Sequence, residues 1–280
     1  MLETEVRGPI TRVHVWRTMW GRSFYTASAY LVDGLLVDTG PPATAREVVA
    51  WARGQEVHQV VNSHHHEDHS GGDGPLQRAL GVPVAAHHAA VPILAAFPRL
   101  PLYRRLVWGQ PRNVVAEPLG AAVETARYRF EVIPTPGHTP DHVCFFEPRE
   151  GWLFGGDLFV HERVRYLRAG EDAGAILASL RGVLALRPRL LLCAHAGFVS
   201  EPCAAIERKI AYWEGLAEAA RRWQAEGLSL RETTERVLGP EDVTARASRG
   251  QFSKLNLIRS LLEANENRPR IDTNGHEPQA

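Results

Sequence analysis

The feature that most constrains this chain is the stretch from Asn62 to Gly72, NSHHHEDHSGG. It places four histidines and two acids directly after HQVV, an apolar run that predicts a buried strand. Burying ionisable groups costs several kcal/mol unless other groups compensate them. The stretch is therefore either a solvated loop or part of a site that gathers these side chains around a cation. Matching ligands further along the chain would decide between the two.

Composition limits the partners that such a chain can have. Of its 280 residues, 44% are hydrophobic and 23% are charged, which is ordinary for a soluble globular protein. Its 32 basic and 32 acidic residues balance, so no net charge recruits nucleic acid or an anionic membrane, and we expect neither partner. The chain shows no signal-peptide pattern, no segment of transmembrane length and only three scattered cysteines. We predict a cytoplasmic location.

Strand-like runs dominate the first 200 residues, and helical patterns dominate the rest. The predicted strands cover 10–16, 25–32, 35–40, 58–63, 82–87, 128–137, 142–148, 151–157 and 189–195. Helices are predicted over 43–53, 72–80 and 173–186, and segment 89–118 is either a helical insertion or a mobile lid. Amphipathic helices follow over 204–227, 229–239 and 250–265. This order predicts stacked sheets with helices outside and a helical appendage.

We accordingly divide the chain into a catalytic domain over residues 1–200, a helical C-terminal extension over 201–264, and a disordered tail over 265–280. The apolar faces of the C-terminal helices must be buried somewhere. The partner is either the same chain or a second copy, so a homodimer is one of the alternatives.

Seven side chains qualify as metal ligands. Four lie in the histidine-rich stretch, and the other three each end a strand-like run: His64, His66, Asp68, His69, His138, Asp157 and His195. Five imidazoles and two carboxylates suit two divalent cations better than one, and these donors favour zinc, with iron or manganese as alternatives. In an extended segment the residues at 64, 66 and 68 share one side. His65 and Glu67 would then face the surface.

The pattern H-x-H-x-D-H, followed by a separate His, an Asp and a His, resembles the metallo-β-lactamase superfamily over roughly residues 10–199. The resemblance is to the glyoxalase II and lactonase branch, because true zinc β-lactamases lack a bridging carboxylate at the position of Asp157. It implies a four-layered α/β/β/α sandwich. One metal would be held by His64, His66 and His138, and the other by Asp68, His69 and His195, with Asp157 bridging. Asp38 would orient a ligand imidazole through a hydrogen bond.

The resemblance implies a binuclear metal-dependent hydrolase of small molecules. A metal-bridging hydroxide would attack an ester, thioester or lactone carbonyl, and Asp68 would orient this nucleophile or pass a proton to the leaving group. One alternative is a phosphodiester or phosphotriester hydrolase on the same centre. Another is an oxidoreductase resembling the mononuclear iron persulfide dioxygenases, which bind iron through the residues matching His64, His138 and Asp157.

Substrate choice should depend on three elements outside the ligand set. These are the 97–108 insertion, the 159–172 loop and the C-terminal helices. Tyr103, Trp108, His161, Arg165 and Tyr166 are candidates to line the pocket, and an arginine there would suit a carboxylate or phosphate. His142 is ambiguous between contact with a ligand and contact with substrate.

Overall fold

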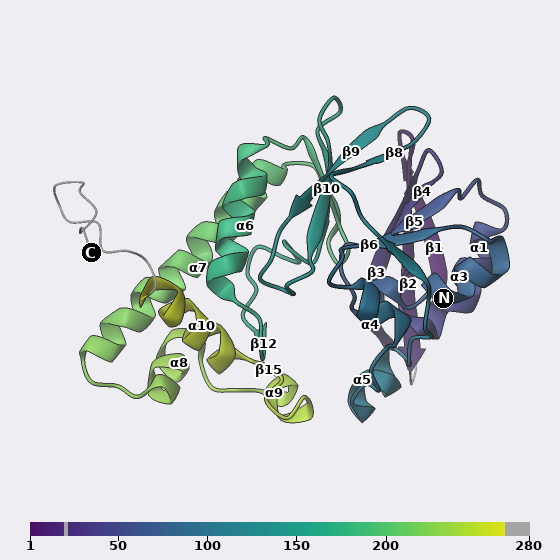
Figure 1. Ribbon diagram of the computed structural model, residues 1–280. Coiled ribbons are helices and arrows are strands. Elements are labelled where there is room, and N and C mark those ends of the chain that lie inside the picture. Colours follow the sequence, from purple (N-terminus) through teal and green to yellow (C-terminus); the bar gives the residue numbers. More distant parts are fainter. Residues whose placement is uncertain (20–21, 267–280) are drawn as a thin grey trace.

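Two β-sheets form the centre of the molecule (Figure 1). The computed structural model describes residues 1–19 and 22–266. The first sheet runs in chain order through its strands, which are β1 (Leu2–Arg7), β2 (Ile10–Met19), β3 (Arg22–Val32), β4 (Leu35–Val37), β5 (Gln59–Val61), β6 (Val84–Ala86) and β7 (Ala116–Pro118). Strands β1 to β4 pair antiparallel, and β4 to β7 pair parallel.

The second sheet has the order β14-β13-β11-β10-β9-β8. Its strands are β8 (Ala122–Glu124), β9 (Arg129–Pro134), β10 (Val143–Glu147), β11 (Trp152–Gly156), β13 (Leu190–Cys193) and β14 (Gly197–Val199). Only β11 and β13 pair in parallel, and α6 (Ala173–Ala185) lies in the connection between them. A separate two-stranded sheet joins β12 (Leu167–Arg168) to β15 (Phe252–Ser253).

Alternation along the strands divides the core into layers, because successive side chains of a strand point to opposite faces. On β13, Leu190 and Leu192 pack between the two sheets, whereas Leu191 packs outward beneath the helices. On β4, Val37 faces the second sheet, and Leu36 faces the helices that cover the first. Each sheet is thus buried on both faces, which requires an outer helical layer on each side.

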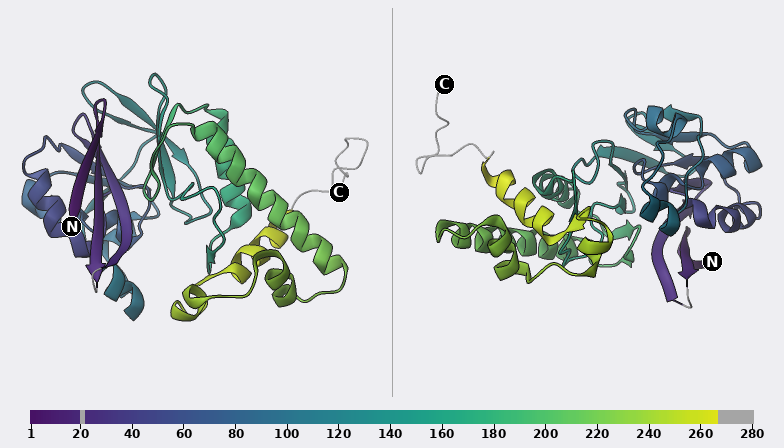
Figure 2. Two further views of the ribbon diagram at one scale, coloured as in Figure 1. Left: turned by 180° about the vertical axis from the view of Figure 1, so that it is seen from behind. Right: turned by 90° about the horizontal axis from the view of Figure 1, so that it is seen from below.

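Helices supply these outer layers. The first sheet is covered by α1 (Ala45–Ala52), which follows the short 3₁₀ turn Pro42–Thr44, and by α3 (Asp73–Leu80) and α4 (Val91–Ala95). The second sheet is covered by α6 and the long α7 (Pro202–Ala225), as both views in Figure 2 show. The predicted four-layered α/β/β/α sandwich is confirmed.

The chain after α7 forms the predicted helical appendage. It contains α8 (Leu230–Leu238), α9 (Val243–Ala247) and α10 (Lys254–Glu266). A reciprocal hydrogen-bonded cap between Ser229 and Glu232 explains why α8 begins where it does. Buried apolar side chains of α6, α7 and α10 pack in one cluster, so the boundary proposed at residue 200 lies within a continuous core. The tail predicted over 265–280 overlaps the end of α10 and otherwise lies outside the described residues.

Several short elements were not predicted. Strands β7, β8 and β14 have three residues each, too few to establish a two-residue period. The mostly exposed β1 is fixed by its pairing with β2. Segment 89–118 forms α4, α5 (Leu102–Val107) and β7, as the helical-insertion alternative predicts in part. Among the described residues, no helix is both long and apolar enough to span a membrane.

The hydroxyl of Tyr30 ties the two sheets together close to a predicted ligand. It donates a 2.7 Å hydrogen bond to the carbonyl oxygen of Cys193, at the end of β13, and Tyr30 is only 2% exposed. Tyr30→Phe leaves this buried acceptor unpaired and should lower the free energy of unfolding by about 1–2 kcal/mol. Chemical denaturation measures the change. Tyr128→Phe, which keeps the ring packed on Trp152, is the matched control and should change stability less.

Candidate metal centre

The candidate ligands meet where strands of both sheets end. In the first sheet, β5 leads directly into Ser63 and His64. In the second sheet, β11 leads into Asp157, β13 leads to His195, and the loop between β9 and β10 carries His138. The carboxyl ends of adjacent parallel strands open onto the same edge of a sheet, and ligand sites form there in open α/β folds.

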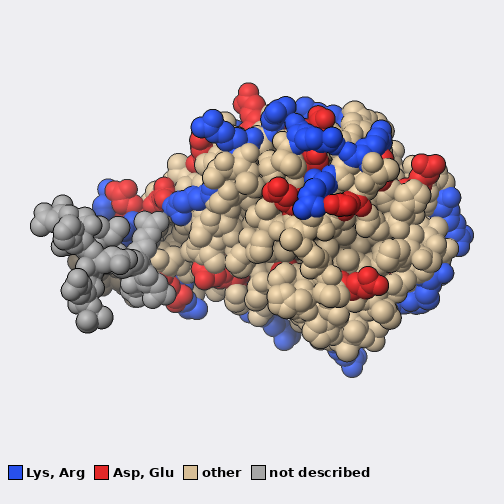
Figure 3. Space-filling view, turned by 45° about the horizontal axis from the view of Figure 1, so that its top comes forward, with Lys and Arg blue, Asp and Glu red and all other residues tan. Residues whose placement is uncertain are grey.

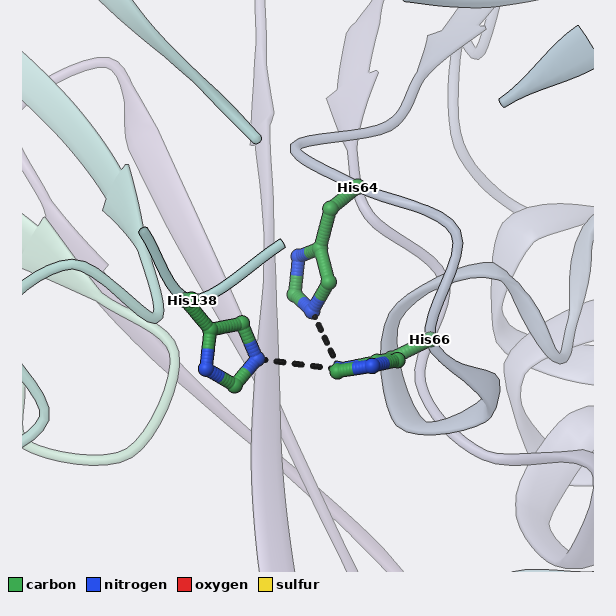
Figure 4. A group of neighbouring side chains, drawn as sticks. All are labelled: His64, His66 and His138. Atoms are coloured by element: carbon green, nitrogen blue, oxygen red, sulfur yellow. Dashed lines mark hydrogen bonds between the residues drawn. The ribbon is translucent and has the colours of Figure 1, made fainter. Parts of the chain in front are cut away.

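Three histidines form the first group. The Nδ1 atom of His66 lies 3.0 Å from Nε2 of His64 and 2.9 Å from Nε2 of His138. Figure 4 shows the three rings converging, with these nitrogens directed at one another. The three atoms are candidate ligand atoms for one cation.

Asp68, His69, Asp157 and His195 form the second group. Oδ1 of Asp157 lies 3.2 Å from Nε2 of His69 and 3.1 Å from Nε2 of His195. Its other oxygen, Oδ2, lies 3.3 Å from Nε2 of His138 in the first group. Oδ2 of Asp68 lies 3.9 Å from Nε2 of His69 and 3.9 Å from Nε2 of His195. One oxygen of Asp157 therefore faces each group, as a bridging ligand requires.

The histidine-rich stretch is not extended beyond residue 66. Residues Glu67–Ser70 form the helical turn α2, which brings Asp68 and His69 to the second group. The expectation that Glu67 faces the surface is wrong: its side chain is 1% exposed and pairs through both oxygens with Arg104 of α5. His65 is partly buried and hydrogen-bonds Asp141 at 2.8 Å. The helical turn therefore changes which residues face inward.

The ring nitrogens facing away from the two groups have partners of their own. The carboxylate of Asp38 accepts a 2.8 Å hydrogen bond from Nδ1 of His69, as expected. The backbone N–H and the hydroxyl of Ser63 donate to the same carboxylate. Nδ1 of His195 lies 2.8 Å from the carbonyl oxygen of Thr26, and Nδ1 of His138 lies 2.9 Å from Glu171. A hydrogen-bond acceptor at the far nitrogen fixes the tautomer that leaves Nε2 free to ligate.

His142 contacts the backbone of a ligand residue. Its Nε2 accepts a 3.1 Å hydrogen bond from the backbone N–H of Asp157, and its Nδ1 lies 2.7 Å from the hydroxyl oxygen of Thr135. Burial lowers the pKa of His142 to about 3, so the ring stays neutral and keeps its acceptor. His142 therefore contacts a candidate ligand residue and positions the backbone of Asp157.

The two groups differ in their electrostatics. Burial, reinforced by the neighbouring imidazoles, lowers the pKa of His64 and His66 well below the usual value. In the second group burial acts in the same direction, but Asp157 outweighs it and raises the pKa of His195 to about 9. Burial would raise the pKa of Asp157, yet His195 and His69 hold it well below the usual value. His64 and His66 are therefore neutral imidazoles and Asp157 is an ionised carboxylate, which are the donor states that divalent metals need. His195 is protonated at neutral pH in the absence of a cation, so metal binding at the second group would displace a proton.

Two atoms of the second group provide a direct test of whether a cation fits. Within the part of the chain that the structure describes, Nε2 of His69 and Oδ1 of Asp157 are buried and have no hydrogen-bond partner, although they lie 3.2 Å from each other. Buried polar atoms are rarely left without a partner, and a bound cation would satisfy both of these atoms. Both atoms point into the space enclosed by the second group. The donor set and the unpaired atoms fit a bound cation.

Residues 23–195 match the family described as the metallo-beta-lactamase superfamily. The chain belongs to this superfamily.

Superfamily relatives match part of the chain in sequence and nearly all of it in fold. The hydroxyacylglutathione hydrolase of Polaromonas sp. is 29% identical over 180 residues, 61% of each chain. The enzyme of the same name from Thiobacillus denitrificans is 34% identical over 160 residues, 57% of this chain and 55% of the relative. The chain thus spans about three fifths of the length of these curated relatives. A beta-lactamase domain protein from Burkholderia ambifaria shares the fold, with a TM-score of 0.70 over 98% of this chain and 93% of its own, at 19% identity.

A pocket of about 330 Å³ opens over the two groups of candidate ligands. One side is lined by Trp108 and the Arg104 side chain of the insertion, and the other by Trp213, Phe252 and neighbouring residues of the C-terminal segment. Of the five candidate specificity residues, only Trp108 and Tyr166 line it, whereas Tyr103, His161 and Arg165 do not. Arg165 instead donates to the carbonyl oxygen of Leu238.

Sequence reasoning missed four charged residues around this pocket: Arg104, Arg168, Glu171 and Lys209. The side chains of Arg104, Arg168 and Lys209 contact residues more than 35 positions away in the chain, and no local sequence motif predicts such contacts. A signal existed for Lys209, one of only two lysines in the chain, because it lies in the apolar stripe of α7. Its ammonium donates to the carbonyl oxygens of Leu158 and Phe159, directly after Asp157.

Gly156 is required by the close packing behind Asp157. Its φ is +47°, and a Cβ atom there would lie 2.7 Å from Nε2 of His142 and 2.8 Å from the side chain of Ser63. Gly156→Ala should therefore lower the free energy of unfolding by about 2 kcal/mol or more. Gly182→Ala, at an open position on α6, should leave stability unchanged or raise it. Equal denaturation midpoints for the two variants would contradict the packing argument.

Proposed function

We propose that the chain is a metal-dependent hydrolase that holds two divalent cations, zinc being most consistent with the donors and iron or manganese being alternatives. His64, His66 and His138 would hold one cation, and Asp68, His69 and His195 the other, with Asp157 between them. The observation that carries the proposal is the placement of the two carboxylate oxygens of Asp157, one toward each group, together with the unpaired buried atoms of the second group.

The bound metals would supply Lewis acidity, which polarises the carbonyl under attack and makes water a nucleophile near neutral pH. The protein's own part is positioning. Asp68 lines the pocket, and its Oδ2 atom lies 3.9 Å from Nε2 of His69, on the same side of the centre as Oδ1 of Asp157. We assign it the orientation of the attacking water and the transfer of one water proton to the leaving group.

A thioester of a small molecule is the substrate class that we favour. In that reaction a C–O bond forms from water to the acyl carbon, the C–S bond breaks, and the thiolate takes up a proton. The products are a carboxylate, a thiol and one released proton. Support comes from the relatives named hydroxyacylglutathione hydrolase and from a pocket sized for a small molecule. Esters and lactones undergo the same attack and belong to the proposal.

The expected partners and location belong to the same proposal. Basic and acidic side chains are interspersed on the face shown in Figure 3, which supports the expectation that nucleic acid is not a partner. We also propose a cytoplasmic location, two domains divided near residue 200, and either a monomer or a homodimer formed through the C-terminal helices. Size-exclusion chromatography with light scattering decides between the last two.

Metal content provides the first test. The purified chain should carry about two divalent cations, measured by inductively coupled plasma mass spectrometry. It should hydrolyse at least one compound of a panel of thioesters, aryl esters, lactones and phosphoesters, and lose this activity on chelation. Asp157→Ala should lower the metal content to one cation or fewer and abolish turnover, because each group loses one carboxylate oxygen.

His88→Ala is the matched control, since this exposed histidine lies outside both groups and should leave metal content and rate unchanged. Full activity of the chelated protein would refute the proposal. If only the phosphoesters were hydrolysed, the proposed reaction would be phosphoester hydrolysis in place of thioester hydrolysis. One iron per chain with oxygen uptake would replace it by the dioxygenase alternative.

The hydrogen bond from His69 to Asp38 provides a second test. Asp38→Asn keeps the shape but removes the charge that orients the imidazole. We expect the affinity for the cation that His69 would hold to fall about 10–100-fold. Competition with a chromophoric chelator measures it. Asp33→Asn removes a surface partner of Arg127 instead and should leave metal affinity unchanged. Equal affinities for the Asp38 variant and the parent would contradict the assigned role.

A further inference from the structure

Arg168 is a cationic side chain at the candidate centre without an anionic partner. It lies on β12, and its Nη1 atom is 2.5 Å from Nε2 of His66. Within residues 1–19 and 22–266 its guanidinium forms no ion pair.

His66 cannot satisfy this guanidinium once its other nitrogen ligates a metal. Nδ1 of His66 is the atom directed at His64 and His138. With Nδ1 occupied, a neutral imidazole carries its proton on Nε2, and a guanidinium has only donors. Two donors then face each other, so Arg168 needs an acceptor from elsewhere.

The neighbouring carboxylates are already engaged. Both oxygens of Glu67 bind Arg104. One oxygen of Glu171 pairs with Nδ1 of His138, and the other accepts the backbone N–H of Arg168 itself. The acceptor for the Arg168 side chain must therefore come from a molecule that enters the pocket, which Arg168 lines.

On the basis of the proposed hydrolase function, we propose that Arg168 binds a carboxylate on the acyl part of the substrate, close to the carbonyl that is attacked. A single imidazole ring separates the guanidinium from the space enclosed by the first group. The bound anion therefore lies within a few bonds of the reacting carbon. A planar guanidinium matches a carboxylate through two parallel hydrogen bonds.

A monoanionic carboxylate fits this position better than a phosphate. The other cations of the pocket are committed, since Arg104 pairs with Glu67 and the ammonium of Lys209 donates to two backbone carbonyls. Asp68 also lines the pocket and opposes further negative charge. The remaining wall is largely apolar, with Trp108, Trp213 and Phe252.

The position of Arg168 depends on the C-terminal segment. Arg168 pairs with Phe252 in the sheet of β12 and β15, and the backbone N–H of Ala169 donates to Gln251 at 2.7 Å. These backbone contacts do not involve the guanidinium. Substitution of the side chain should therefore leave the strand in place, which makes Arg168 suitable for a side-chain test.

The test compares acyl thioesters of N-acetylcysteamine with the full-length, zinc-loaded protein. Malonyl, succinyl and glutaryl thioesters are each paired with the uncharged carboxamide of the same shape. For at least one chain length, kcat/KM should be about 10–100-fold higher for the carboxylate than for the amide. Arg168→Gln should lower kcat/KM for the carboxylate about 10-fold or more beyond any change for the amide, which removes the preference, and Arg168→Lys should retain part of it.

Arg163→Gln is the matched control, because Arg163 is exposed on the same loop. It should keep the full preference. The proposal is overturned if the parent shows no preference at any length, or if Arg168→Gln lowers both rates equally. Turnover of the amide by the Arg168 variants shows that they are folded and loaded.

A binding measurement separates this proposal from the hydrolase function itself. If the metal-loaded protein hydrolyses no thioester, the proposed function fails, and the role of Arg168 is decided by calorimetry with malonate, succinate and glutarate against their monoamides. Tighter binding of a dicarboxylate that is lost in Arg168→Gln supports the assignment. Equal binding of diacid and monoamide by the parent protein overturns it.

Discussion

The dominant constraint on this fold is the need to gather seven hydrated side chains at one point between two sheets, four of them buried and three partly buried. Each buried imidazole or carboxylate would cost several kcal/mol alone. Asp157 reduces this cost because its two oxygens face His138 on one side and His69 and His195 on the other. These ligands come from both sheets, so the sheets must keep their mutual register. The hydrogen bond between Tyr30 and Cys193 holds that register at the edge where the ligands emerge.

Positioning of the ligands is distributed over groups that do not themselves reach the candidate cations. Asp38 fixes the ring of His69, Glu171 fixes the ring of His138, and His142 holds the backbone of Asp157. Gly156 permits this arrangement, because any side chain at its position would collide with His142. A site of this kind tolerates little change in the layer behind its ligands, although that layer contributes no donor to the metal.

Local signals explain what the sequence could predict. The sheets followed from alternation and from turn residues, and the seven candidate ligands followed from a dense histidine motif plus strand ends flanked by glycine or alanine. The burial of Glu67 could not be predicted, because it depends on the helical turn α2 and on Arg104, which lies 37 positions away. Arg168 was missed for a similar reason, and Arg165, three positions earlier, was the candidate instead. Only the pairing of β12 with β15 decides which arginine of that loop faces the pocket.

The chain before residue 200 supplies the candidate metal ligands, and the chain after it supplies one wall of the pocket. All seven candidate ligands precede residue 200, whereas Lys209, Trp213 and Phe252 come from the segment after it. Lys209 binds the backbone just after Asp157, so the C-terminal helices buttress the ligand loop as well as facing the substrate. The strand β15 sets the position of Arg168 through backbone hydrogen bonds alone. The choice of acyl group can therefore change through side chains on β12 and in the C-terminal segment, while the ligands and the groups that orient them stay fixed.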